Sequence, residues 1–218
     1  MLFIDTTVEQ RGFAPAATAL ALRTIACCHG ACHRPDGRLL TGIGVLTATP
    51  DAERGVAFTA AARCLHDGDT VIDLLDWLEP RLSADRAIIS WHNWGSVPFR
   101  LRALADPARH PQIVAAAQDT ADRWRDMPRG HTWHLRQARA GHLPCLCGPD
   151  GRIDECDAAM PAVLLPDPAA TATELIGEAV AGWQVWARQF GAFDDAEHPA
   201  QAALRALDAW RADEPSAR

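Results

Sequence analysis

Short apolar segments that end abruptly in polar residues predict the strands of a sheet. "LFID" stops at Asp5, as a buried central strand would. "LRTIACCHGA" and "RLLTGIGVLTAT" follow, and the turn residues Pro35, Asp36 and Gly37 between them favour a β-hairpin. "RAIISWHN" is a further apolar segment with a polar end. Together these segments predict a sheet with an antiparallel start.

The remaining apolar residues recur with helical spacing. In "TVIDLLDWLEPRL" they lie three and four positions apart, with acidic residues between them. The same spacing predicts helices in "VPFRLRALAD", in "ATELIGEAVAGWQVWARQFGAF" and in "PAQAALRALDAWRAD". Strands followed by alternating helices and strands indicate an α/β protein whose mixed sheet is flanked by helices.

Composition is that of a folded, globular chain. Of the 218 residues, 48% are hydrophobic and 22% are charged, which argues against long disorder. We interpret residues 1–193 as one domain and residues 194–218 as an acidic C-terminal helix and tail. No apolar run approaches the ~20 residues of a membrane span, and the cysteine spacing is not that of a secreted disulfide framework. We therefore expect a cytoplasmic protein with no membrane partner.

Charge is distributed unevenly along the chain. The net charge is −7, but residues 100–139 carry eight arginines against four acidic residues. Arginine binds phosphate through paired hydrogen bonds, and tryptophan stacks on unpaired bases. This segment therefore predicts contact with single-stranded nucleic acid, although a solvated arginine-rich surface with buried tryptophans is the alternative. The candidate nucleic-acid-binding residues are Asn93, Arg123, Trp124, Arg125, Arg129, Arg136 and Arg139.

The order of these segments resembles the ribonuclease H-like fold of DEDD-type 3'-5' exonucleases. The likeness rests on the strand ending in Asp5, the hairpin, the helix, and the strand ending in "WHN" before "GSVPFRLRA". It covers roughly residues 1–193 and is greatest to predicted exonucleases related to the proofreading domain of family B DNA polymerases. The resemblance implies a ribonuclease H-like mixed sheet with an antiparallel hairpin start, and Mg²⁺ or Mn²⁺ as cofactor if the protein is active.

Most metal ligands that the resemblance implies are missing. Two-metal cleavage of a phosphodiester needs several carboxylates around two ions about 3.5–4 Å apart. Asp5 matches the first ligand, but Thr7 replaces its partner glutamate, and no aspartate follows Asn93. Ala179 stands where the last aspartate belongs, and the neighbouring Glu178 would face about 100° around the helix. We expect Asp5 to be a remnant catalytic and metal-binding residue, with Glu178 as the nearest acidic substitute.

The segment "CCHGACH" offers another possible metal site. Cys28 with Cys32 and His29 with His33 are each four residues apart, which would place soft ligands on one helix face. The spacing matches no common zinc module, and cysteine is also a frequent small buried residue. We favour buried thiols over zinc ligands.

Three functions remain open. The first is an exonuclease-like protein, catalytically impaired or inactive, that acts on or binds nucleic acid. The second is a divergent active metal-dependent 3'-5' exonuclease that uses Asp5, Glu178 and another acid such as Asp157. The third is a protein interaction subunit, without nucleic-acid binding, whose acidic C-terminal helix docks to a basic partner.

Overall fold

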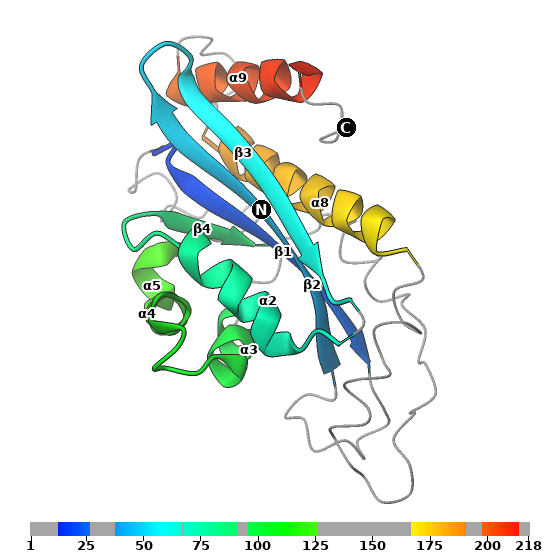
Figure 1. Cartoon of the computed structure of the whole chain (residues 1–218). Coiled ribbons are helices and arrows are strands. Elements are labelled where there is room, and N and C mark those ends of the chain that lie inside the picture. The colour runs from blue at the N-terminus through cyan, green and yellow to red at the C-terminus, as the bar shows by residue number, and fades with distance from the viewer. Residues whose placement is uncertain are drawn as a thin grey trace, which may run out of the picture.

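In the described part of the chain, a five-stranded mixed sheet forms the centre of the fold (Figure 1). The computed structural model describes residues 13–26, 38–66, 68–90, 96–125, 167–190 and 198–213. The strands are β1 (Ala17–Ala26), β2 (Arg38–Asp51), β3 (Gly55–Cys64), β4 (Ala87–Ser90) and β5 (Trp124–Arg125). Their order across the sheet is β3-β2-β1-β4-β5; β1, β2 and β3 pair antiparallel, and β4 is parallel to both β1 and β5. This arrangement confirms the predicted α/β class with an antiparallel start, and it is consistent with a ribonuclease H-like fold.

Helices cover both faces of the sheet (Figure 1). They are α2 (Val71–Leu78), the 3₁₀ turn η1 (Glu79–Arg81), α3 (Ser96–Leu104), α4 (Pro111–Gln118), α5 (Thr120–Arg123), α8 (Pro168–Arg188) and α9 (Pro199–Asp213). Helices α2, α3 and α4 pack on one face, and α8 with α9 packs on the other. None of the helices described here is long and apolar enough to cross a bilayer.

Local sequence explains where several helices begin. Thr70 and Asp73 form a capping box at the start of α2, in which the Asp73 carboxylate accepts the Thr70 backbone N–H at 2.7 Å. At α8, Asp167 accepts the backbone N–H of Ala170 at 2.8 Å, and Pro168 occupies the first turn, where its missing N–H costs nothing.

Two features of the sheet differ from the expectations. The strand predicted at residues 2–5 lies outside the described residues. The predicted hairpin is confirmed, since β1 pairs with β2, but β1 begins at Ala17, before the predicted segment. The pattern also missed β3, which pairs with β2 along its whole length, from Gly55 to Cys64.

The two faces of the sheet carry side chains of different size. Large aliphatic residues face α2 to α4, whereas small ones line much of the α8 face. The large residues are Leu20, Leu22, Leu40, Ile43, Val45 and Ile88. The small ones include Ala17, Ala19, Ala21, Ala48, Ala60 and Ala62. A face of small side chains permits a close approach of the covering helix.

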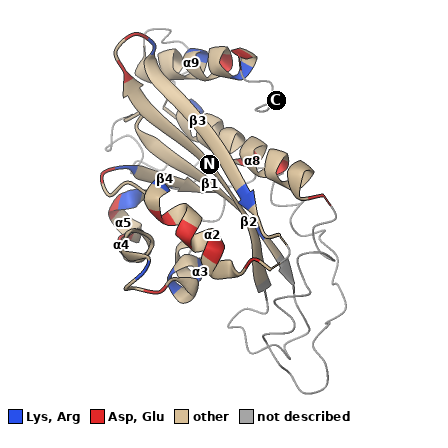
Figure 2. Ribbon diagram, in the orientation of Figure 1, with Lys and Arg blue, Asp and Glu red and all other residues tan. Residues whose placement is uncertain are grey.

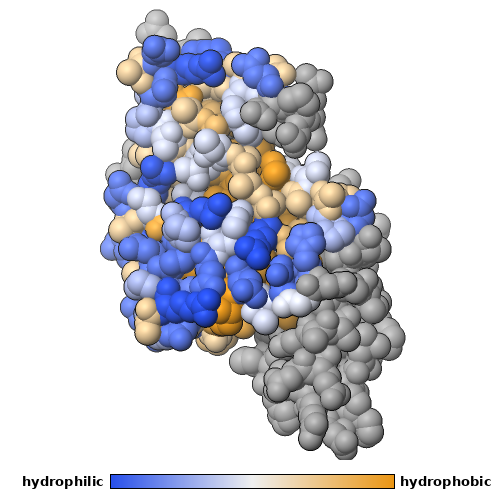
Figure 3. All heavy atoms as spheres, in the orientation of Figure 1, coloured by the Kyte–Doolittle hydropathy of each residue, from blue (hydrophilic) through white to orange (hydrophobic). Residues whose placement is uncertain are grey.

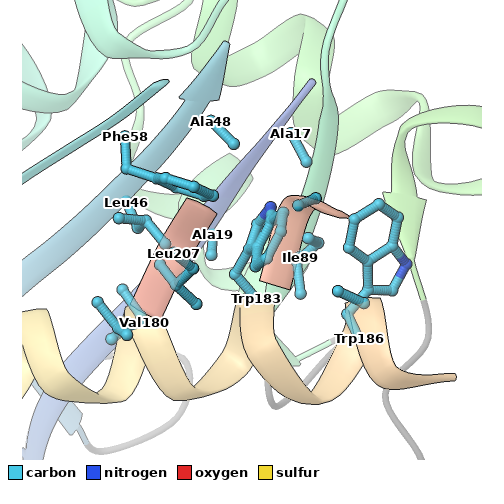
Figure 4. Packing of buried hydrophobic residues seen from close by; sticks show 14 of the residues in the cluster. Ala17, Ala19, Leu46, Ala48, Phe58, Ile89, Val180, Trp183, Trp186 and Leu207 are labelled. Carbon is cyan, nitrogen blue, oxygen red and sulfur yellow. The ribbon is translucent and has the colours of Figure 1, made fainter. Parts of the chain in front are cut away.

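Aromatic residues fill the space between α8 and the strands (Figure 4). Trp183 of α8 is fully buried, and its ring meets Phe58 of β3 edge-on, with 4.9 Å between ring centroids. Trp186 stacks near Phe13, at 5.3 Å. Leu207 of α9 joins the same cluster, so α9 shares its core with the sheet and α8.

Helix α8 touches the backbone of β2 at two glycines. A Cβ placed on Gly44 would lie 2.5 Å from the carbonyl oxygen of Leu175, and one on Gly42 would lie 2.8 Å from the Leu175 side chain. The Gly44 contact is with helix backbone, which cannot rotate away as a side chain can. Gly44 is therefore required for this helix position.

We predict opposite effects of adding one methyl group at two glycines. Gly44→Ala should destabilise the protein by about 1–3 kcal/mol, because it forces α8 away from β2. Gly177→Ala is the matched control: a Cβ there meets nothing within 4 Å, and the position is helical, so stability should rise by about 0.5–1 kcal/mol. Urea unfolding followed by tryptophan fluorescence measures both changes. Equal stability of the wild type and the Gly44→Ala variant would contradict the close contact.

Candidate functional site

An arginine and two glutamates meet where α8 crosses β1. The Arg23 guanidinium donates to the Glu174 carboxylate at 2.6 Å and lies 3.9 Å from the Glu178 carboxylate. The Glu178 side chain is only 7% exposed, whereas that of Glu174 is 64% exposed. One glutamate of this group is therefore buried and the other faces solvent.

The sheet is irregular at the same place. Arg23 pairs with Gly42, but the next residue, Thr24, pairs with Leu40, so the register shifts by one residue. The Thr41 hydroxyl donates to the backbone carbonyl of Arg23 at 3.3 Å. Such bulges bend a strand and redirect its side chains. Gly42, which pairs with Arg23, lies under the Leu175 side chain of α8.

These residues do not fit a pair of divalent metal ions. The guanidinium of Arg23 already lies against the carboxylates of Glu174 and Glu178, where a bound metal would need open oxygen ligands. In the described ranges, no group of three or more His, Cys, Asp or Glu residues is placed to hold a metal ion. The position of Asp5 lies outside the described residues.

Sequence reasoning included Glu178 but missed Arg23 and Glu174. Glu178 was expected to lie about 100° around the helix from Ala179; both residues belong to α8 and both are buried. A signal for the group was present in the sequence: Arg23 follows Ala17, Ala19 and Ala21 at every second position. A charged residue in line with inward-facing alanines indicates a buried partner.

The described arginine and tryptophan candidates are engaged within the chain. Arg123 is buried, and its guanidinium donates to the backbone carbonyls of Ser83 at 2.5 Å and Arg86 at 3.4 Å. Burial lowers the pKa of this guanidinium. The Trp124 indole is also buried, and its N–H donates to the carbonyl of Ala116 at 2.8 Å. These two side chains attach β5 to the neighbouring loop and to α4.

Arg125 lies at the end of β5 and is partly exposed. Its guanidinium donates to the carbonyl of Asp122 at 2.6 Å. The other candidates lie outside the described residues: Asp5, Asn93, Arg129, Arg136 and Arg139. The same holds for Asp157 and for the "CCHGACH" segment.

A second cluster of charged side chains joins α2 to the start of α4, in a region where Figure 2 shows acidic residues along α2. The Arg109 guanidinium donates two hydrogen bonds to Asp76, one of them at 2.6 Å from Nε. His110 is fully buried, and its Nε2 lies 3.1 Å from the same carboxylate. The Nδ1 of His110 accepts the backbone N–H of Asp106 at 3.0 Å, so the proton stays on Nε2.

This cluster resembles a catalytic aspartate-histidine pair but has no free base. Because both nitrogens of His110 are engaged, one by a backbone N–H and one by Asp76, neither can take a proton from a substrate. The Glu79 carboxylate accepts the backbone N–H groups of Gln112 at 2.6 Å and Ile113 at 3.0 Å, which caps α4. The cluster fixes the helices on this face of the sheet.

The sheet order and the helices on both faces define an α/β protein of mixed-sheet topology. Comparison with protein-family models, curated proteins and solved structures finds no significant match to this chain. The fold class therefore rests on the structure itself.

We predict that Arg23 stabilises the fold mainly through buried Glu178 and only slightly through exposed Glu174. Arg23→Ala should destabilise the protein by about 1–3 kcal/mol, because buried Glu178 loses its guanidinium partner. Glu174→Ala should cost less than about 1 kcal/mol, as expected for an exposed pair. Urea unfolding at neutral pH measures both. The double variant Arg23→Ala/Glu178→Gln should lose less free energy of unfolding than Arg23→Ala alone. An equal or larger loss would contradict the pairing of Arg23 with Glu178.

The Asp76 cluster predicts a dependence of stability on pH. Hydrogen bonds from Arg109, and then from His110, lower the pKa of the Asp76 carboxyl below its usual value. A lowered carboxyl pKa adds stability above the unfolded pKa of about 3.9, and this stability is lost as pH falls through the folded pKa. Asp76→Asn should therefore lower the urea midpoint at neutral pH, and the difference from wild type should shrink in acid. Asp208→Asn, on the exposed side of α9, is the control. Its urea midpoint should equal that of wild type at both neutral and acid pH.

Proposed function

We propose that this chain is a ribonuclease H-like protein that binds single-stranded nucleic acid without two-metal catalysis. The observation that carries the proposal is the surface of α3. Phe99 is the exposed large hydrophobic residue of the described structure, with 65% of its surface accessible to solvent. Arg102, also exposed, follows it by three positions and so shares its side of the helix.

The position of α3 supports a binding role. The helix begins at Ser96, a few residues after the carboxyl end of β4, which is parallel to β1. In open α/β sheets, ligands bind outside the carboxyl ends of parallel strands. Val97 and Leu101 anchor α3 in the core, so Phe99 projects from a fixed helix. An aromatic ring beside an arginine is the combination that stacks an unpaired base and contacts its phosphate.

The Arg23 group supports the absence of metal-dependent cleavage. In this protein the cation beside Glu174 and Glu178 is a guanidinium of the chain itself. Arginine cannot supply the open coordination positions through which a metal ion activates water. Binding without hydrolysis is the activity that the described residues favour.

We predict that a fluorescein-labelled single-stranded oligonucleotide binds the full chain, with an affinity that falls steeply as salt rises. Phe99→Ala should weaken binding about tenfold, the cost of losing one stacked base. Arg102→Ala should weaken it and also reduce the salt dependence. Fluorescence anisotropy measures each variant. Arg54→Ala, an exposed arginine in the β2–β3 turn, is the matched control and should bind like wild type.

A cleavage assay separates the alternative functions. With Mg²⁺ or Mn²⁺ present, a 3'-labelled strand should remain intact over hours. Degradation that is abolished by Asp5→Ala would instead establish a divergent exonuclease. Absence of binding even at low salt would overturn the proposal and leave a role in protein interaction.

A further inference from the structure

An open strand edge and a groove lie side by side at one border of the sheet. Strand β3 is last in the sheet order and pairs with β2 alone among the described strands. No other described strand pairs with its second edge, which runs along the ten residues of β3. Between Gly55 and Arg63 the strand carries no charge and no proline, the usual devices that keep an edge from pairing.

A groove of about 430 Å³ runs between β3 and α9. Its β3 wall includes Val56 and Phe58, which face α9, and also Ala57, whose side chain alternates to the other face. Because its lining includes residues from both faces of β3, the groove extends to the edge of that strand. The hydropathy surface in Figure 3 shows apolar residues along β3, above the hydrophilic surface over α2.

Helix α9 keeps this groove open by the placement of its alanines. Ala202, Ala206 and Ala209 line the groove, spaced by four and three residues and so on one side of the helix. Leu207 faces the core instead, and Trp210 lies beside Phe58, with 6.0 Å between ring centroids. The groove thus combines an aromatic floor with a wall of short side chains.

The rim of the groove is mostly basic. Arg54, in the β2–β3 turn, and Arg205 of α9 both line it, with Asp213 at the end of α9 as the acidic residue. An extended peptide that pairs with β3 would point every second side chain into the groove and place charged neighbours at its rim. Charge complementarity favours acidic side chains at those positions.

We propose that β3 and the groove beside α9 bind an extended peptide segment of a partner protein, in which apolar residues alternate with acidic ones. Backbone hydrogen bonds to the free edge of β3 supply affinity. An apolar side chain on Phe58 and Trp210, with acidic side chains near Arg54 and Arg205, supplies selectivity. This site is independent of the α3 surface proposed to bind nucleic acid.

A pair of synthetic peptides tests the proposal on the full chain. The first is a fluorescein-labelled peptide, about as long as β3, in which valine alternates with glutamate. The second has arginine in place of glutamate. The acidic peptide should bind with micromolar affinity by fluorescence anisotropy, and the basic one at least about tenfold more weakly. Hydrogen exchange of the β3 amides should slow when the acidic peptide is bound, a change that loose electrostatic attraction would not produce.

Two variants on α9 locate the contact. Ala209→Glu places a negative charge in the groove at an exposed position and should weaken the acidic peptide about tenfold. Asp208→Ala, the exposed neighbour outside the groove, should bind within about twofold of wild type. Failure of the acidic peptide to bind, unchanged binding by Ala209→Glu, or unchanged β3 exchange would each overturn the proposal. A dimer that already protects β3 without peptide would show that a second copy of the chain occupies this edge.

Discussion

The contact between α8 and the glycines of β2 determines the position of the whole helical layer on that face of the sheet. At Leu175 the helix backbone rests on Gly44, with no side chain between them. Eight residues further, about 12 Å along the axis, Trp183 separates α8 from the strands with a complete indole ring. A backbone contact at Leu175 and a buried indole at Trp183 are thus two points at which α8 rests on the sheet. Phe58 and Leu207 of α9 pack in the same cluster as Trp183, so the position of α9 depends on that of α8.

The same contact also organises the charged group. Glu174 and Glu178 flank Leu175, the residue that α8 presses against the glycines. Arg23 stands opposite Gly42 in the sheet, so its side chain extends beneath the helix toward both carboxylates. Because α8 cannot shift without losing the glycine contact, the carboxylates are held at the guanidinium. The close contact between Leu175 and the glycines thus fixes the positions of the charged groups around Arg23.

The sequence predicts long, strongly patterned elements and fails where small residues dominate. The pattern identified β2, α2, α8 and α9, since each carries large apolar residues at regular spacing. It missed β3 and the start of β1, because alanine-rich segments have low intrinsic preference for strands and depend on pairing with a neighbour. The site shows the same limit. From the sequence, Arg123 and Trp124 were either binding residues or a solvated arginine beside a buried tryptophan, and the tertiary contacts with Ser83 and Ala116 show that both are buried.

Both helical layers pack on the sheet through apolar residues, but different charged contacts join their helices, which separates the two proposed surfaces. On the α2 side, carboxylates hold the helices together: Asp76 binds Arg109 and His110, and Glu79 caps α4. Helix α3 packs against α4 in this layer, so the nucleic-acid surface depends on charged contacts that weaken in acid. On the other side α8 and α9 are held mainly by shape and apolar burial, with the Arg23 group as a charged contact between α8 and β1. The groove beside β3 belongs to that layer. A condition that loosens α3 can therefore leave the β3 groove intact, so loss of one binding activity need not entail loss of the other.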